Sequence, residues 1–148
     1  MATLGNKAHG VKLYLAGTAA TSTAFATASG TAVEECTIIT PPEESNETAD
    51  ATSHDSAADE FVNVGVIDGG EVAIEGIWSG ATGQEQLRGY NGGVNKMFFI
   101  NLPTTNAPNQ ITFSGAVTGW QITAERPDIL KYSSKIKVSG AVVHGTQP

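Results

Sequence analysis

The sequence has 148 residues, a formal net charge of −7 and 40% hydrophobic residues, which suits one domain, residues 1–148, with a packed core. Its single cysteine, Cys36, excludes an internal disulfide, and a buried reduced thiol is the ordinary expectation. No segment approaches the roughly 20 apolar residues of a membrane helix, and residues 1–7 hold no apolar run typical of a signal peptide. We therefore expect a soluble protein made in a cytoplasm, with no membrane partner.

Charge is distributed unevenly along the chain. Residues 1–33 carry two lysines and no acid, whereas residues 34–85 carry thirteen carboxylates and no Lys or Arg. Residues 86–148 carry six bases and two acids. Opposite charges on two parts of one chain favour association between copies. The pattern argues against a nucleic-acid-binding domain, which needs a basic groove.

The first forty residues predict two strands joined by a connection of small residues. Alternating apolar side chains predict a strand over residues 10–15. Residues 16–32 are almost entirely Ala, Thr, Ser and Gly, and we expect Phe25 to pack into the core. A second strand is predicted over residues 33–40. Pro41–Pro42 should end it, because proline cannot donate to a strand ladder.

Residues 43–60 form the longest polar stretch and predict a long acidic loop. A compact domain seldom carries so many polar residues without a use for them. A metal site could be imagined at His54, but the spacing of the acids around it matches no known ligand set, so a solvated charge run is favoured. The residues of interest are Glu43, Glu44, Glu47, Asp50, His54, Asp55, Asp59 and Glu60.

A turn at Asp68-Gly69-Gly70 separates strands predicted over residues 61–66 and 71–78. The second strand alternates strictly, which predicts one face in the core and one outside. Val72, Ile74 and Trp78 should face the core, and Glu71 and Glu75 should face away from it.

A short helix should follow, beginning at Thr82. Thr82-Gly83-Gln84-Glu85 fits a capping box, in which the Thr82 hydroxyl and the Glu85 carboxylate satisfy backbone donors. Leu87 and Tyr90 then share one face, and Asn91-Gly92-Gly93 supplies residues that tolerate the left-handed conformation at a helix end.

The last third of the chain predicts three more strands, over residues 96–102, 111–124 and 132–143. Met97 to Ile100 is a continuous apolar run, which predicts burial on both faces. The second of these strands should twist near Gly119, because Trp120 falls on its polar face. Seven or so strands and one short flanking helix predict a mainly β fold, a β-sandwich or a nearly closed β-barrel.

Sequence patterns typical of enzymes are absent. The serines lack a nucleophile elbow, and no dinucleotide-binding or phosphate-loop glycine pattern occurs. His9 and His144 lie near the two ends and should be exposed. We therefore expect no enzymatic activity, no cofactor and no metal.

Several motifs together resemble one protein family. The acidic stretch Ala49–Ser56 is followed by Asp68-Gly69-Gly70-Glu71-Val72, Phe113-Ser114-Gly115 and Lys137-Val138-Ser139-Gly140. In this order, over residues 12–143, the chain resembles the major tail tube protein of long, non-contractile-tailed bacteriophages.

The resemblance implies a structural virion protein of the phage tail, synthesised and assembled in the host cytoplasm. Its subunits would form hexameric rings that stack into a tube, and DNA would pass through the channel during ejection without specific binding. The implied partners are further copies of the chain and the tape measure, tail tip and terminator proteins. The polar segment 43–60 would be an extended hairpin loop packed on adjacent subunits or rings. Because the sequence ends at Pro148, we expect no additional immunoglobulin-like domain.

Strand parity adds an expectation about the channel. Since Glu71 and Glu75 should point away from the core, they should face either the lumen or a neighbouring subunit. Repeated around a ring, they would form an acidic band that repels phosphates over roughly 8 Å at physiological salt.

Two other readings remain open. One is another tail component of the same fold, such as a terminator or baseplate-hub protein. The other is a virion decoration or glycan-binding β-sandwich, which aromatic side chains at loop tips would support. Trp78 and Trp120 instead fall inside predicted strands.

Overall fold

The computed structural model describes residues 10–18, 30–55, 57–104 and 108–146. Within these ranges there are nine strands and one helix. The helix is α1 (Thr82–Gly89), and the strands are β1 (Lys12–Thr18), β2 (Thr31–Ala32), β3 (Cys36–Thr40), β4 (Ser45–Asp50), β5 (Phe61–Asp68), β6 (Glu71–Ile77), β7 (Lys96–Asn101), β8 (Gln110–Thr123) and β9 (Lys131–Gly145).

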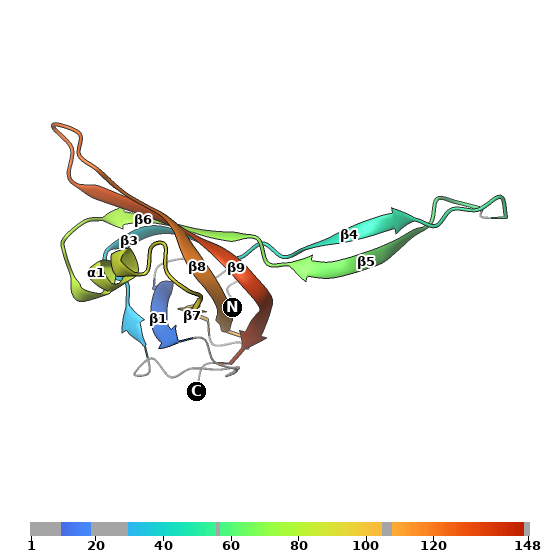
Figure 1. Ribbon diagram of the computed structural model, residues 1–148, viewed down its shortest axis with the longest axis horizontal. Helices are drawn as coiled ribbons and strands as arrows, with labels where there is room; N and C mark the ends of the chain where they lie inside the picture. Colours follow the sequence, from blue (N-terminus) through green and yellow to red (C-terminus); the bar gives the residue numbers. More distant parts are fainter. Residues whose placement is uncertain (1–9, 19–29, 56, 105–107, 147–148) are drawn as a thin grey trace, which may run out of the picture.

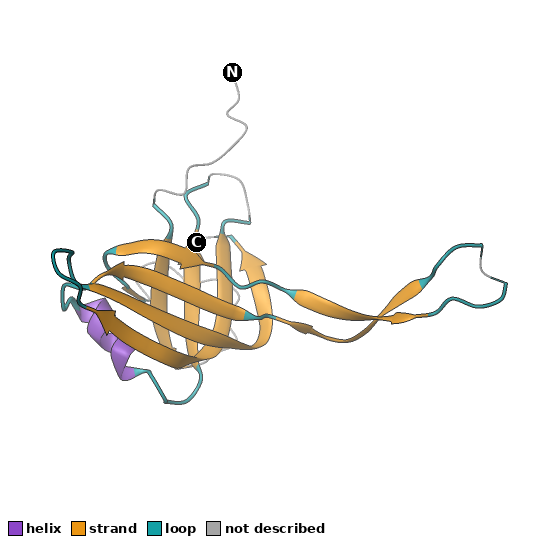
Figure 2. Cartoon of the chain, turned by 90° about the horizontal axis from the view of Figure 1, so that it is seen from above, coloured by secondary structure: helices purple, strands orange, loops and turns teal. Residues whose placement is uncertain are grey.

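Seven strands form one antiparallel sheet in the order β2-β1-β7-β8-β9-β6-β3. The sheet curls into a nearly closed barrel with α1 at one end, and the hairpin of β4 and β5 projects far beyond it (Figures 1 and 2). The mainly β fold with one short helix is confirmed, and of the two expected architectures the chain adopts the curled barrel.

Strict alternation places the core inside the curl. Val72 and Ile74 on β6 are fully buried, while Glu71 before them and Glu75 after them are exposed, as the strand parity predicts. Leu87 of α1 covers the end of the core. Val33, between β2 and β3, also belongs to the core. The remaining core side chains come from the long strands of the sheet: Leu13, Leu15, Phe98, Ile100, Ile111, Phe113, Val117, Tyr132, Ile136 and Val138.

Strand β7 is buried on both faces, as its apolar run predicts. Phe98 stacks on Phe113 of β8, with ring centroids 5.5 Å apart. Phe99 points the other way and stacks on Tyr14 of β1 at 4.8 Å. Successive side chains of a strand point to opposite faces, so β7 is held by aromatic contacts on both sides of the sheet.

The strand expected over residues 33–40 is interrupted, which corrects that prediction. Residues 34 and 35 form a turn in which Glu35 takes φ 58°, and separate strands β2 and β3 lie on either side. These strands are the two edges of the sheet. The N–H of Val33 donates to Leu13 O, and the N–H of Ile77 donates to Glu35 O, both at 2.9 Å. The turn therefore bridges the two edges, and Phe25, expected in the core, lies outside the described residues.

The predicted capping box is wrong. The N-cap is Ala81 without a side-chain cap, and Glu85 instead pairs with Arg88, 2.6 Å from its guanidinium. The cap comes from the β2–β3 turn, because the Glu34 carboxylate accepts the N–H of Gly83 at 3.1 Å. Gly83 is required there, since any Cβ would collide with the Ala32 carbonyl. The carboxylate that caps the helix is therefore that of Glu34, distant in the sequence, and not that of Glu85.

The expected twist in β8 is present. The pairing of β8 with β9 shifts register between Val117 and Gly119. Beyond the shift, Trp120 turns toward the core, stacking on Tyr132 at 5.4 Å and meeting Trp78 edge-on at 5.6 Å. The two strands then continue past the barrel as a long hairpin (Figure 1).

Candidate assembly surfaces

The arm, defined as residues 45–68, is a two-stranded hairpin and not the irregular loop expected from its composition. β4 pairs antiparallel with β5, so that Asp50 lies opposite Phe61 and Thr48 opposite Asn63. The pairing shifts register between Ser45 and Glu47. Neither strand pairs with the barrel sheet. The arm consequently presents an unpaired backbone edge on each side (Figure 2).

Every acid singled out in the polar segment is exposed, along the whole arm. Glu43 and Glu44 precede β4 at its root, Glu47 and Asp50 lie on β4, and the others lie at the tip. Between them there is no Lys or Arg, so the arm has one sign of charge. The tip residues are His54, Asp55, Asp59 and Glu60.

The arm tip is closed by hydrogen bonds. Asp50 accepts the N–H of Thr52 at 2.9 Å, and hydrogen bonding to the Thr52 side chain and to this N–H lowers the pKa of the Asp50 carboxyl. The Thr52 hydroxyl accepts the N–H of Glu60 at 2.8 Å. Among the described residues, no three His, Cys, Asp or Glu side chains gather as a metal site would require. Asp50 therefore has a structural partner at the base of the tip, and the other tip acids are solvent-exposed.

Apolar side chains of the arm are also exposed. Phe61, Val62 and Ile67 of β5 are between 51% and 63% exposed. A two-stranded hairpin has no second layer to bury them, and such a hairpin alone is marginally stable in water. Exposed apolar groups in a contiguous element mark an interaction surface. The sequence predicts a strand over residues 61–66 but no role for these side chains. The apolar residues that directly follow the acidic stretch 43–60 were the available signal.

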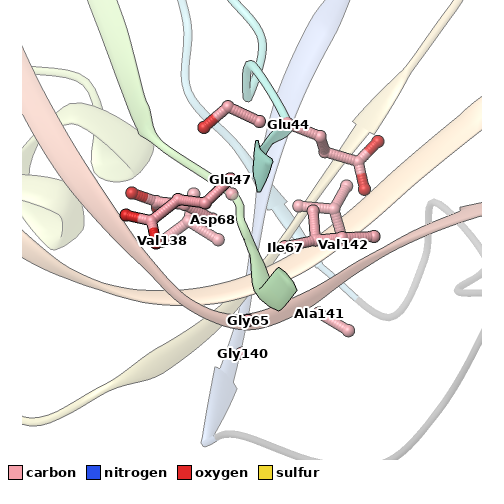
Figure 3. A pocket seen from close by; sticks show the side chains of 11 residues that line it. Glu44, Glu47, Gly65, Ile67, Asp68, Val138, Gly140, Ala141 and Val142 are labelled. Carbon is pink, nitrogen blue, oxygen red and sulfur yellow. The ribbon is translucent and has the colours of Figure 1, made fainter. Parts of the chain in front are cut away.

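The arm joins the barrel at a groove of about 940 Å³ (Figure 3). Ile67, Val138 and Val142 line its apolar wall. Asp68 lies 3.5 Å from Lys137, and hydrogen bonding from Gly70 together with this lysine lowers the pKa of the Asp68 carboxyl. The rest of the lining is Glu44, Ser45, Glu47, Gly65, Gly69, Gly140 and Ala141.

A bulge in β9 shapes this groove. Three residues of β8, from Thr112 to Ser114, lie opposite five of β9, from Ser139 to Val143. Gly140 in the bulge has φ 84°, which L side chains seldom adopt. His144 beyond it contacts the Glu44 carboxylate at 2.9 Å. The root of the arm is therefore fixed to β9 on both sides of the groove.

Glu71 and Glu75 lie on the outer face of β6, beside lysines of β9. The Lys135 ammonium is 4.0 Å from the Glu71 carboxylate. Lys137 is the register partner of Glu71 and reaches Asp68 instead. The face is therefore of mixed charge and not the purely acidic band expected from Glu71 and Glu75.

A buried polar cluster holds the start of α1. The Gln84 amide, fully buried, donates to the carbonyls of Glu34 and Ile77 at 2.8 Å and accepts the N–H of Ser79. Tyr132 donates to Glu34 O at 3.1 Å, and its hydroxyl lies 3.2 Å from the Cys36 sulfur. Burial raises the pKa of the Cys36 thiol and of the Tyr132 phenol. Hydrogen bonds among these neutral groups connect the β2–β3 turn, α1 and β9.

The β8–β9 tip, defined as residues 122–131, is the second exposed apolar element. Ile122, Ile129 and Leu130 are between 41% and 53% exposed. Asp128 is held by Lys131 at 2.8 Å, and hydrogen bonding to Lys131 lowers the pKa of the Asp128 carboxyl. The tip and the arm point away from the barrel on opposite sides (Figure 1).

Comparison with solved structures finds the same fold in phage-tail-like particles. No family model and no curated protein matches the sequence. In the described part of the chain, no helix is long and apolar enough to span a membrane. A chain in "Tail of empty GTA particle computed with helical refinement, C6 symmetry" superposes with TM-score 0.74 at 14% identity, covering 96% of this chain and 100% of that one.

The fold is that of tail and baseplate subunits. A chain of the "Virion of native gene transfer agent (GTA) particle" gives TM-score 0.72 at 14% identity, over 94% of this chain and 98% of that one. A chain of the anti-feeding prophage (AFP) baseplate, 6-fold symmetrised, gives 0.65 at 10% identity over the whole of both chains. The likeness therefore includes the barrel and most of the remaining chain.

Proposed function

We propose that this chain is a structural subunit of a phage tail, whose copies form rings, six to a ring, that stack into a tube. The observation that carries the proposal is the arm, an acidic hairpin with exposed apolar side chains and unpaired edges, on a barrel with a tail-subunit fold. A neighbouring copy would cover the arm and pair the open edges β2 and β3. The C6 symmetry of the GTA tail supports six as the ring number.

The remaining expectations follow from the same proposal. DNA would pass through the channel without specific binding, and tape measure, tail tip and terminator proteins would contact the tube. The particle would be a long, non-contractile phage tail. The arm would pack on an adjacent subunit or ring through Phe61, Val62 and the acids around them.

Electron microscopy of the purified full chain tests the function. At high concentration, or with tail-tip complexes as seeds, we expect rings or tubes about 100 Å wide, from six domains of roughly 30 Å around a channel. A protein that stays monomeric at every concentration and with seeds would contradict the proposal.

We also propose that Glu71 and Glu75 line the channel. Lysines beside them make the wall nearly neutral, so phosphates would neither bind it strongly nor be held off over a long range. Replacing both acids by lysine should slow genome ejection at low salt, and raising the salt should restore it. Unchanged ejection at low salt, or a failure to assemble, would place the two residues at a subunit contact instead.

A baseplate or terminator subunit is the second candidate. The AFP baseplate chain supports it, because its likeness extends over the whole of both chains. Such a subunit forms one ring at a fixed place, whereas a tube subunit repeats along the tail. Labelling the chain in intact particles therefore separates the two: signal along the tail supports the tube, and signal at one end supports the ring.

A further inference from the structure

We propose that the β8–β9 tip of one copy seats in the groove at the root of the arm of a second copy. This contact rests on the proposed function and specifies how one ring meets the next. It joins a convex apolar element to a concave apolar one, and both are unpartnered in a single chain.

The groove accepts an apolar side chain and one positive charge. Ile67 is 58% exposed on its wall, beside Val138 and Val142. Of its carboxylates, Glu44 is occupied by His144 and Asp68 by Lys137. The Glu47 carboxylate has no hydrogen bond or ion pair to any described residue and is part of the groove lining (Figure 3).

The β8–β9 tip supplies both the apolar side chains and the positive charge. Ile129 and Leu130 provide exposed aliphatic surface. Asp128 is held by Lys131, and Glu125 also acts on that lysine, since both carboxylates raise the pKa of its ammonium. Arg126 remains as the tip charge without an ion pair in the described part of the chain. The complementary pair across copies is therefore Arg126 with Glu47.

The two surfaces cannot meet within one copy. The tip ends where β9 begins, at Lys131, and the groove lies around Gly140 of the same strand. A strand rises by about 3.3 Å per residue, which separates the two surfaces by roughly 30 Å. In the proposed stack of rings, each copy would offer its tip to a copy on one side and its groove to a copy on the other. A head-to-tail contact of this kind extends without closing when successive copies are displaced along one axis.

Charge reversal in the full chain tests the contact. Arg126→Glu and Glu47→Arg are made singly and together. Arg88→Glu, on an exposed arginine of α1 that is ion-paired with Glu85 of the same helix, serves as the charge-reversal control. We expect each single variant to form rings but at least tenfold less tube by mass, the double variant to recover most of the wild-type amount, and the control to behave as wild type. Circular dichroism melts check that each variant is folded.

Cross-linking gives a second readout that does not depend on charge. In a Cys36→Ser background, Leu130→Cys with Ala141→Cys should give a ladder of disulfide-linked chains in assembled protein, and Arg88→Cys with Ala141→Cys should not. Wild-type tubes together with unaffected single variants and no ladder would overturn this contact and leave the tube function intact. If wild-type protein forms no assembly at all, the proposed function fails, and this contact fails with it.

Discussion

The barrel and the arm use the same antiparallel pairing but differ in what stabilises them. In the barrel, alternate side chains of seven strands close on one core, and residues such as Phe98 and Phe113 have no solvent exposure. In the arm, two strands pair only with each other, and Phe61 remains 63% exposed. The difference is one of burial: the barrel buries its apolar side chains through its own contacts, whereas those of the arm are exposed in a single chain, as on an interaction surface.

The largest expected effect on the free energy of unfolding comes from truncating one phenylalanine of the barrel core, compared with truncating one of the arm. Phe98→Ala opens a cavity in the core and should lower the free energy of unfolding by about 3–5 kcal/mol. Phe61→Ala removes an exposed ring and should change it by about 0.5 kcal/mol or less. Urea unfolding of the dissociated chain measures both. Equal losses would show that the arm contributes to the core and that the comparison is wrong.

The next effect lies where the barrel is joined to α1. Gln84→Ala leaves the buried carbonyls of Glu34 and Ile77 without their donor, and should cost about 2 kcal/mol of unfolding free energy. Gln86→Ala, which removes one partly buried hydrogen bond to Tyr90, is the control and should cost about 0.5 kcal/mol. If the two losses match, the buried cluster is not what holds the helix.

Removing the arm should change the stability of the barrel little but should abolish assembly. With residues 46–66 replaced by a short Gly-Ser linker, the barrel keeps its core, and the linker changes the loop entropy by about 1 kcal/mol or less. The unfolding midpoint should therefore stay close to that of the full chain, while tubes disappear in electron micrographs. Normal tubes from the shortened chain would exclude the arm as an assembly element.

The smallest expected effect is a pH dependence at the junction of the two regions. Hydrogen bonding from Gly70 and the charge of Lys137 lower the pKa of Asp68. A lowered pKa contributes stability above the unfolded value of about 3.9, and this contribution is lost as the pH falls through the folded value. The stability difference between the wild type and Asp68→Asn should thus be present at pH 7 and vanish in stronger acid. A difference that grows on acidification would contradict this sign.

Sequence patterns located the elements whose determinants are local. The alternation around Val72 and Ile74, the helix at residues 82–89 and the irregularity near Gly119 are all confirmed. Errors arose where the determinant is distant. The carboxylate that caps α1 belongs to Glu34, 49 residues away from Gly83, and no local motif contains that pairing. Strand β4 consists largely of weak strand formers and is a strand only because β5 pairs with it.

Distance along the sequence also explains why the arm and the groove could be predicted only in part. The acids of residues 43–60 were readable as a charge run, but a charge run does not say which carboxylates already have partners. The Glu44 carboxylate contacts His144, 100 residues later, whereas the Glu47 carboxylate has no ion pair or hydrogen bond in the described structure. The groove likewise depends on a bulge in β9 that the alternation of residues 132–143 conceals.

The single sign of charge on the arm has a kinetic consequence. The arm contains six carboxylates, at Glu47, Asp50, Asp55, Asp59, Glu60 and Asp68, and no Lys or Arg. Two arms that approach each other in solution repel, so symmetric pairing through the exposed rings of Phe61 is opposed until salt screens the charges. Polymer growth would then have a slow nucleation step that a preformed end bypasses. Free subunits without a preformed end would then assemble only after a lag, and the lag time would shorten as the ionic strength rises.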